Sequence, residues 1–394
     1  MIKHKVCGII CEYNPFHNGH KYHVSEARRF SEADYVIAVM SGNFVQRGEP
    51  AILDKWARTE MALKSGVDMV LELPAVYALS SAEYFATGAV DLLQKTGIVT
   101  HISFGSESFE GVSGADELKR IAEETINGPS VNKESLKAGC SFAAASRNSV
   151  VAKANDVLAT EYLRALNRLH ANMQIVPIKR NGAGHSGEGS AMFIRQLIYE
   201  GKISEVQNYV PAESFEILQR EINDGKCPVY AKNFEKIIIA DLRRLGVEGL
   251  RDRPFVSEGL EYKIYDAACN CSTFADLVEE CTSKRYTASR IRRIVFASML
   301  GILRKNVTSP VPYIRVLGMR RNCGALMDLL QQNAAVPIIL SKAKFLHQSE
   351  EEQSNFASEL LKIENNTADL YSLAFSDAQS RVGATELTHP LIFV

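Results

Sequence analysis

The feature that most constrains the fold is a series of strand-length apolar segments, separated by helical patterns, in the first two hundred residues. Asp54–Gly66 and Ser81–Gly97 each have an acid near the start and end on Gly, which is typical of helices. Apolar strands between helices predict a parallel sheet covered on both faces, with ligands bound beyond the carboxyl ends of the strands. The predicted strands are Val6–Cys11, Tyr35–Met40, Met69–Leu73, His101–Phe104 and Gln174–Ile178.

The pattern changes near residue 225. A chain of 394 residues is too long for one ordinary core. We expect residues 1–225 to form an α/β, Rossmann-like domain with a helical insertion at about 114–148. We expect residues 226–394 to form a mostly α-helical domain, in which "VPYIRVLG" and "AVPIILSKAKF" are the predicted strands.

Composition excludes a membrane-spanning chain and a secreted disulfide scaffold. With 46% hydrophobic and 23% charged residues, the sequence contains no uninterrupted apolar run of about 18 residues. The apolar stretch near the N-terminus has strand length and lacks a small-residue cleavage site, so we interpret it as the first strand. The eight cysteines are scattered and form no CxxC pair, which favours free thiols in a reducing cytoplasm over disulfides or zinc.

The segment "CEYNPFHNGHKYH", residues 11–23, places three histidines where the first strand gives way to a helix. Pro15 ends the strand, and a helix is predicted from near residue 17 to Phe30. His17 and His20 then share one face of the first turn, and Gly19 leaves space beside them. Free backbone N–H groups, two imidazoles and a glycine predict an anion site for a phosphate chain.

Two other interpretations of the histidines remain open. Zinc-binding helices usually carry His at i and i+4 with a carboxylate between, whereas the spacing here is three and no third ligand follows. Alternatively, the imidazoles are ordinary residues at a helix start. For His23 this ordinary interpretation is the favoured one.

Positive charge is concentrated in one segment of a chain whose formal net charge is −1. Between Lys284 and Arg321 there are ten basic residues and no Asp or Glu. This pattern predicts a polyanion partner, with Tyr286 available for stacking on bases; the alternative is pairing of the arginines with acidic surface elsewhere in the chain. The residues we assign to nucleic-acid binding are Lys284, Arg285, Arg290, Arg292 and Arg293.

Several motifs together carry a family resemblance. "HNGH" after a first strand is similar to the HxGH signature of the HIGH-type nucleotidyltransferases. The longer strings "GIICEYNPFHNGHKYH", "VMSGNFVQRGEPAILDKWARTEMALKSGVDMVLELP" and "SSAEYFATGAV" closely resemble the bacterial tRNA(Met) cytidine acetate ligase family. The resemblance extends from the N-terminus to about residue 200.

The resemblance implies a HIGH-type nucleotidyltransferase fold, in which residues 1–225 form the ATP- and acetate-binding catalytic domain and residues 226–394 form a tRNA-binding domain. Gly105 ends a predicted strand, where a backbone close to the nucleotide needs no side chain. Asn155 either contacts the nucleotide or only caps a helix, and Arg180 either neutralises phosphate or pairs with a surface charge. The ATP-binding set is Ile10, Cys11, Glu12, Tyr13, Asn14, Pro15, Phe16, His17, Asn18, Gly19, His20, Lys21, Tyr22, His23, Gly105, Asn155 and Arg180.

Two further segments complete the expected site. In "SAMFIRQLI", Ser190 and Arg195 match a second phosphate-binding motif of the superfamily, although Met192 and Phe193 replace the small residue and Thr found there. The long loop Ser41–Lys55 is expected to shape an acetate pocket. We assign the pocket to Gly42, Asn43, Gln46 and Arg47, and the catalytic set to His17, His20 and Lys55.

The function implied by the resemblance is ATP-dependent activation of acetate as acetyl-adenylate. The acetyl group then passes to the exocyclic amine of the wobble cytidine of elongator tRNA(Met). ATP with Mg²⁺, acetate and tRNA are the implied partners, with no prosthetic group, no dedicated metal site, no membrane and no protein partner, in the cytoplasm. The alternatives are a small-molecule cofactor adenylyltransferase and a non-catalytic RNA-binding protein that retains a nucleotide pocket.

Overall fold

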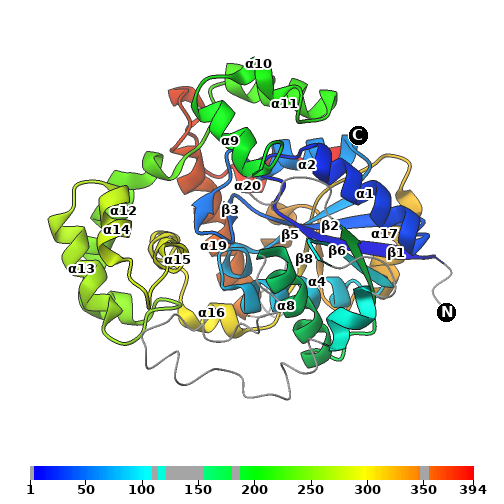
Figure 1. Cartoon of the computed structure of the whole chain (residues 1–394), viewed down its shortest axis with the longest axis horizontal. Coiled ribbons are helices and arrows are strands. Elements are labelled where there is room, and N and C mark those ends of the chain that lie inside the picture. The colour runs from blue at the N-terminus through cyan, green and yellow to red at the C-terminus, as the bar shows by residue number, and fades with distance from the viewer. Residues whose placement is uncertain (1–3, 109–113, 121–153, 180–186, 347–354) are drawn as a thin grey trace.

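The computed structural model describes residues 4–108, 114–120, 154–179, 187–346 and 355–394. A central sheet lies between two layers of helices, and a lobe of helices stands beside one end of it (Figure 1). Of the predicted insertion, residues 114–120 are helical and residues 121–148 lie outside the described ranges. No helix in the described ranges combines the length and the apolarity that crossing a bilayer requires.

One sheet organises the molecule, with strand order β10-β8-β5-β2-β1-β6-β7 and with β9 paired to β8. Neighbouring strands run parallel except β5 and β8, which are antiparallel. The five strands predicted in the first two hundred residues begin where they were predicted. The strands are β1 Val6–Cys11, β2 Tyr35–Ser41, β5 Met69–Leu73, β6 His101–Ser106, β7 Gln174–Lys179, β8 Ile314–Met319, β9 Ile338–Ile339 and β10 Ile392–Phe393.

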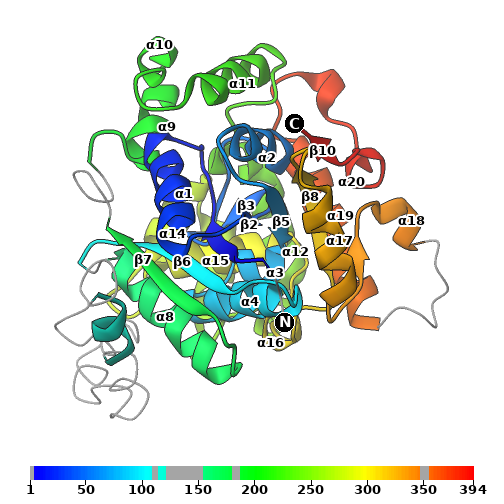
Figure 2. The same ribbon diagram turned by 90° about the vertical axis from the view of Figure 1, so that its right-hand side faces the viewer.

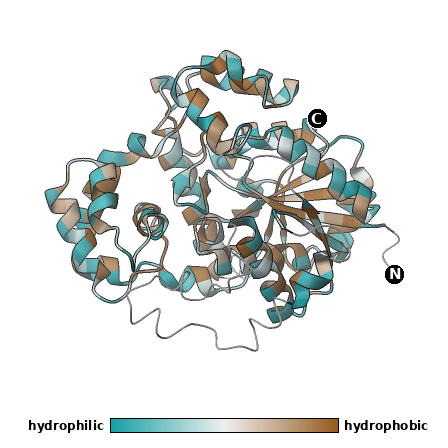
Figure 3. Cartoon of the chain, viewed as in Figure 1, coloured by the Kyte–Doolittle hydropathy of each residue, from teal (hydrophilic) through white to brown (hydrophobic). Residues whose placement is uncertain are grey.

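The side chains of β1 alternate between two buried layers, as a strand covered on both faces requires. Val6 and Ile10 belong to a core that includes Leu93 of α4, whereas Cys7 and Ile9 belong to the core beneath α1 and α2. Figure 3 shows the sheet as the most hydrophobic layer of the molecule. The helices of this part are α1 Asn18–Ser31, α2 Lys55–Lys64, α3 Ala75–Ala78, α4 Ala82–Lys95, α8 Ala154–Arg168, α9 Ala191–Tyr199, α10 Ile203–Val206 and α11 Ala212–Asn223.

The chain beyond residue 225 first forms the helical lobe and then returns to the sheet (Figures 1 and 2). The first strand predicted there is confirmed as β8. The second, "AVPIILSKAKF", contains only the two-residue strand β9, because Lys342–Leu346 is helical. Both strands pair within the same sheet as β1 and β2. The sheet therefore includes residues from both sides of the expected boundary, and the division into two domains stays a prediction. The helices are α12 Glu235–Arg251, α13 Leu260–Asn270, α14 Phe274–Cys281, α15 Ala288–Met299, α16 Arg304–Thr308, α17 Gly324–Asn333, α18 Lys342–Leu346, α19 Asn355–Ser372 and α20 Thr385–Thr388, with 3₁₀ turns at Ala231–Phe234 and Ala378–Ser380.

A short hairpin, β3 Phe44–Val45 and β4 Glu49–Pro50, joins the sheet to the lobe. Its turn residue Gly48 has φ +77°, and a Cβ there would lie 2.6 Å from the backbone nitrogen of Arg293 on α15. Only glycine fits this conformation and this close approach. The fully buried Arg58 of α2 donates to the carbonyl oxygens of Glu12, Ser41 and Gly42, which fixes the loop that leads into the hairpin.

A network of buried charges lies behind the hairpin. The Nζ of Lys55 is 2.6 Å from Oε1 of Glu72 and pairs with Glu386 of α20 as well. Lys342 lies 2.5 Å from the other oxygen of Glu386. Burial alone would raise the pKa of Glu386, but the two lysines outweigh it and lower that pKa to about 2. The network thus joins the C-terminal segment to α2 and β5.

We expect Lys55→Met to destabilise the fold strongly, because it leaves the buried Glu72 without its lysine and leaves Glu386 with Lys342 alone. Removing one partner of a buried ion pair costs about 3–5 kcal/mol. The matched control is Lys64→Met on the same helix, because Lys64 is exposed and its pair with Glu60 contributes at most about 1 kcal/mol. Urea unfolding of both variants measures the difference, and equal stabilities would contradict a structural role for Lys55.

Candidate active site

The strand order reverses at β1, because the chain passes from β1 to β2 on one side and places β6 on the other. Such a reversal leaves room for a ligand beyond the carboxyl ends of the strands. A cavity of about 690 Å³ lies there. Its lining comes from the end of β1, the start of α1, the end of β6, the start of α8, the β3–β4 hairpin and the start of α9.

The rings of His17 and His20 are held by backbone N–H groups at the start of α1. The Nδ1 atom of His17 accepts from Gly19 N at 3.0 Å, and Nδ1 of His20 accepts from His17 N at 3.3 Å. The rings stack with centroids 3.7 Å apart. Because each Nδ1 accepts a hydrogen bond, a neutral ring carries its proton on Nε2. A Cβ on Gly19 would lie 2.8 Å from the His17 ring, so the glycine permits this arrangement.

The first-turn amides of α1 have partners inside the protein, which corrects the expectation of free N–H groups. Asn18 N donates to Tyr209 O at 2.9 Å, and Gly19 N donates to His17. His20 N and Lys21 N donate to the carbonyl oxygen of His17. The helix contributes its dipole to an anion site, and the two imidazoles line the cavity beside it.

The cavity has an apolar part and a polar part. The apolar part is lined by Phe85, Phe104, Val157, Leu158, Tyr162 and Ile178. The polar part includes His17, His20, Arg47 and Arg195. A ligand with a flat apolar ring at one end and anionic groups at the other matches this division.

A carboxylate and two guanidinium groups face one another in the polar part. Oε1 of Glu12 accepts from Gln46 N at 2.9 Å, and Arg195 donates to Asn14 O at 2.8 Å. Burial raises the pKa of Glu12, and this outweighs the Gln46 amide and the nearby Arg47 and Arg195. Burial likewise lowers the pKa of Arg195. The positive charges of Arg47 and Arg195 can therefore interact favourably with a bound anion in this part of the cavity.

Comparison with known proteins assigns the chain to a family. Residues 4–386 match the family model described as HIGH Nucleotidyl Transferase. The tRNA(Met) cytidine acetate ligase of Halothermothrix orenii is 37% identical over 98% of this chain and 99% of its own length, and that of Caldanaerobacter subterraneus subsp. tengcongensis is 39% identical over 98% of both. The chain belongs to the tRNA(Met) cytidine acetate ligase family. The crystal structure of Thermotoga maritima TmcAL bound with alpha-thio ATP has a TM-score of 0.91 at 36% identity, covering 99% of both chains.

Most of the site residues that the family resemblance predicted line the cavity. Asn155 is the second residue of α8 and donates to Glu107 at 2.6 Å, and Ser190 caps α9 by accepting from Phe193 N at 3.2 Å. The Nε2 atom of His23 lies 3.0 Å from Ser103 Oγ. The predicted residues in the lining are Ile10, Cys11, Glu12, Tyr13, Asn14, His17, Asn18, Gly19, His20, Tyr22, His23, Gln46, Arg47, Gly105, Asn155, Ser190 and Arg195.

Other predicted residues lie outside the lining. Lys55 belongs to the buried charge network, and the carbonyl of Gly42 and the side chain of Asn43 shape the loop beside it. Pro15 and Phe16 pack behind the histidine turn, and Lys21 pairs with Glu213 at 2.9 Å on the surface. Arg180 lies outside the described residues.

The basic segment divides into internal and exposed residues. Arg290 donates to Phe255 O, Arg292 pairs with Glu49 at 2.6 Å, and Arg293 donates to Gln46 O. Burial, with a smaller effect of Arg290, lowers the pKa of Arg293 to about 10. Lys284 is exposed, and Arg285 is exposed while pairing with Glu258. Arg292 and Arg293 therefore attach the lobe to the hairpin.

The apolar part of the cavity and several polar residues of its lining were not predicted from the sequence. Tyr162 and Val157 look like ordinary core residues of an amphipathic helix, so nothing in the sequence separates them from packing residues. Glu49 lies inside the loop that was singled out, and Ser289 lies inside the basic segment. Both line the cavity, Glu49 from the hairpin and Ser289 from α15.

We expect His17→Ala to lower the free energy of unfolding by about 1 kcal/mol, because it removes the N-cap of α1. His17→Asn restores a capping side chain and is expected to recover most of that loss. Urea unfolding of the two variants gives the comparison. Equal losses for Ala and Asn would show that capping by residue 17 contributes nothing measurable.

Proposed function

We propose that the protein activates acetate with ATP and acetylates the exocyclic amine of the wobble cytidine of elongator tRNA(Met). The observation that carries this proposal is the cavity beyond β1, where two stacked imidazoles and two arginines adjoin an apolar slot. The names of its relatives, and the alpha-thio ATP in the Thermotoga maritima structure, support the same function.

ATP would place its adenine in the apolar part and its phosphates at the polar part. The Nε2–H groups of His17 and His20 can donate to phosphate oxygens, while Arg47 and Arg195 supply positive charge. Negative charge grows on the α-phosphate and on the leaving pyrophosphate during nucleotidyl transfer, so donors held in place there stabilise the transition state more than the substrate.

The reaction has two steps. An acetate oxygen attacks the α-phosphorus of ATP, the bond to the bridging oxygen breaks, and pyrophosphate leaves. The cytidine amine then attacks the carbonyl carbon of acetyl-adenylate, the bond from that carbon to the phosphate oxygen breaks, and AMP and one proton leave. This sequence requires no covalent enzyme intermediate, and no cysteine is assigned a role.

The proposal also includes sites for acetate and Mg²⁺. Gln46 and Arg47 on the hairpin border the polar part and could hold the acetate carboxylate. Lys55, Gly42 and Asn43 would act indirectly by fixing that loop. Within the described residues no three His, Cys, Asp or Glu side chains gather to hold a metal ion, so Mg²⁺ would be held chiefly by the ATP phosphates. The proposed location is the cytoplasm.

The test is incubation with ATP, carbon-labelled acetate and unfractionated tRNA, followed by digestion and analysis of the nucleosides. We expect label in N4-acetylcytidine that depends on ATP. His20→Ala is expected to lower the turnover about 10²- to 10³-fold, the usual effect of removing one transition-state donor. His4→Ala, at the opposite end of β1, is the control. If tRNA binds but no label enters it, the cofactor adenylyltransferase becomes the better function.

The exposed basic residues Lys284 and Arg285 are proposed to contact the tRNA backbone. Their joint replacement by Ala should raise Kd for tRNA and reduce the dependence of log Kd on log salt concentration, because fewer counterions are released. Activation of acetate without tRNA should be unchanged. Titrations at several salt concentrations measure both quantities, and an unchanged salt slope would exclude these two residues from the tRNA contact.

A further inference from the structure

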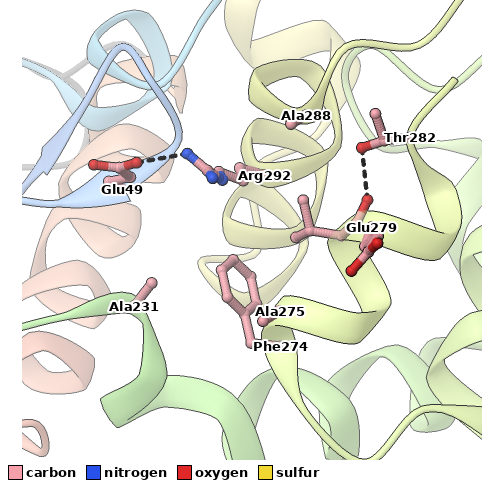
Figure 4. A pocket seen from close by; sticks show the side chains of 9 residues that line it. Glu49, Ala231, Phe274, Ala275, Glu279, Thr282, Ala288 and Arg292 are labelled. Carbon is pink, nitrogen blue, oxygen red and sulfur yellow. Dashed lines mark hydrogen bonds and ion pairs between the residues drawn. The ribbon is translucent and has the colours of Figure 1, made fainter. Parts of the chain in front are cut away.

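A second cavity, of about 500 Å³, lies between the helical lobe and the hairpin (Figure 4). Its floor and walls are largely apolar, from Phe274, Ala275 and Val278 of α14, Ala288 of α15 and Ala231. Glu49 of β4 and Arg292 of α15 meet at one side, 2.6 Å apart. Figure 4 shows Arg292 reaching toward Glu49 with the Phe274 ring facing the same space.

The second cavity adjoins the cavity beyond β1. Glu49 is the residue that the two linings share. The first turn of α15 also contributes to both, because Ala288 and Arg292 line the second cavity and the intervening Ser289 lines the first. A group held by Glu49 in the second cavity would therefore lie at the entrance to the proposed acetyl-adenylate site.

The ion pair leaves hydrogen-bonding capacity on both partners. It joins Nη1 of Arg292 to Oε1 of Glu49. In the described part of the chain, Oε2 of Glu49 and Nη2 of Arg292 have no other hydrogen bond. The pair thus presents an acceptor next to a donor, above an apolar surface that includes an aromatic ring.

This pattern is complementary to one pyrimidine base. The pairing edge of cytosine presents an amine donor beside two acceptors, N3 and O2, so the amine can donate to Glu49 while the acceptors face Arg292. In uracil, the acceptor O4 and the donor N3–H replace the amine and the acceptor N3 of cytosine. The O4 atom would then face the carboxylate of Glu49, and neither could donate a hydrogen bond. Bases splayed out of single-stranded RNA commonly stack on aromatic or apolar side chains.

We propose that the second cavity receives the acceptor cytosine, read by Glu49 and Arg292, and delivers its amine to the acetyl-adenylate. This inference rests on the proposed function, and it adds the site and the residues that recognise the base. It also explains why a carboxylate and an arginine join the hairpin to the lobe at this position.

The experiment compares the affinity of the protein for two tRNA transcripts, one with C and one with U at the wobble position. We expect the wild type to prefer C by about 10- to 100-fold, as for a well-formed bidentate base contact. Glu49→Gln should reduce this preference to a few-fold. Arg292→Lys keeps the charge but loses the planar fork, so it should also reduce the preference. The charge-matched control Glu248→Gln, an exposed residue of α12, should keep it.

Acetate-dependent release of pyrophosphate from ATP, assayed on the same proteins, separates this inference from the proposed function. Thermal unfolding verifies that each variant is folded. If folded Glu49→Gln and Arg292→Lys keep the wild-type preference, or if the wild type has none, the base pocket is wrong while acetylation can still be correct. If the preference depends on Glu49 but the wild type never consumes acetate, the pocket is supported and the proposed function fails.

Discussion

The reversal of strand order at β1 is the constraint on which the rest of the structure depends. With β2 on one side and β6 on the other, the helices that follow these strands diverge and leave the carboxyl end of β1 uncovered. The link from Cys11 to Asn18 crosses this opening and carries Glu12 and His17 into it. The stacked imidazoles and the apolar slot beside them follow from that single topological feature.

The hairpin is the second organising element, because it borders both cavities and is held from two sides. Behind it, the buried charges around Lys55 join α2 and β5 to the C-terminal segment. In front of it, α15 packs so closely on Gly48 that no side chain fits. The lobe is therefore placed against the cavity beyond β1 by close contacts, as group transfer between two bound substrates would require.

The sequence predicted the parallel sheet and the histidine turn because both depend on local patterns, namely apolar runs and the residues around Pro15 and Gly19. The environment of Lys55 could not be predicted, because it looks like a loop cation but is buried between carboxylates from distant parts of the chain. The same is true of Glu49 and Tyr162, whose positions depend on long-range packing. Such contacts leave no periodic signal in one sequence.

A crystal structure with a non-hydrolysable acetyl-adenylate analogue, the acetyl sulfamate of adenosine, would most directly test the arrangement of the proposed active site. We expect adenine between the apolar side chains near Phe104 and Tyr162, and the sulfamate oxygens within hydrogen-bonding distance of Nε2 of His17 and His20. We also expect the acetyl group on the side of Glu49. An analogue bound elsewhere, or bound with its acetyl group turned away from the hairpin, would contradict this arrangement.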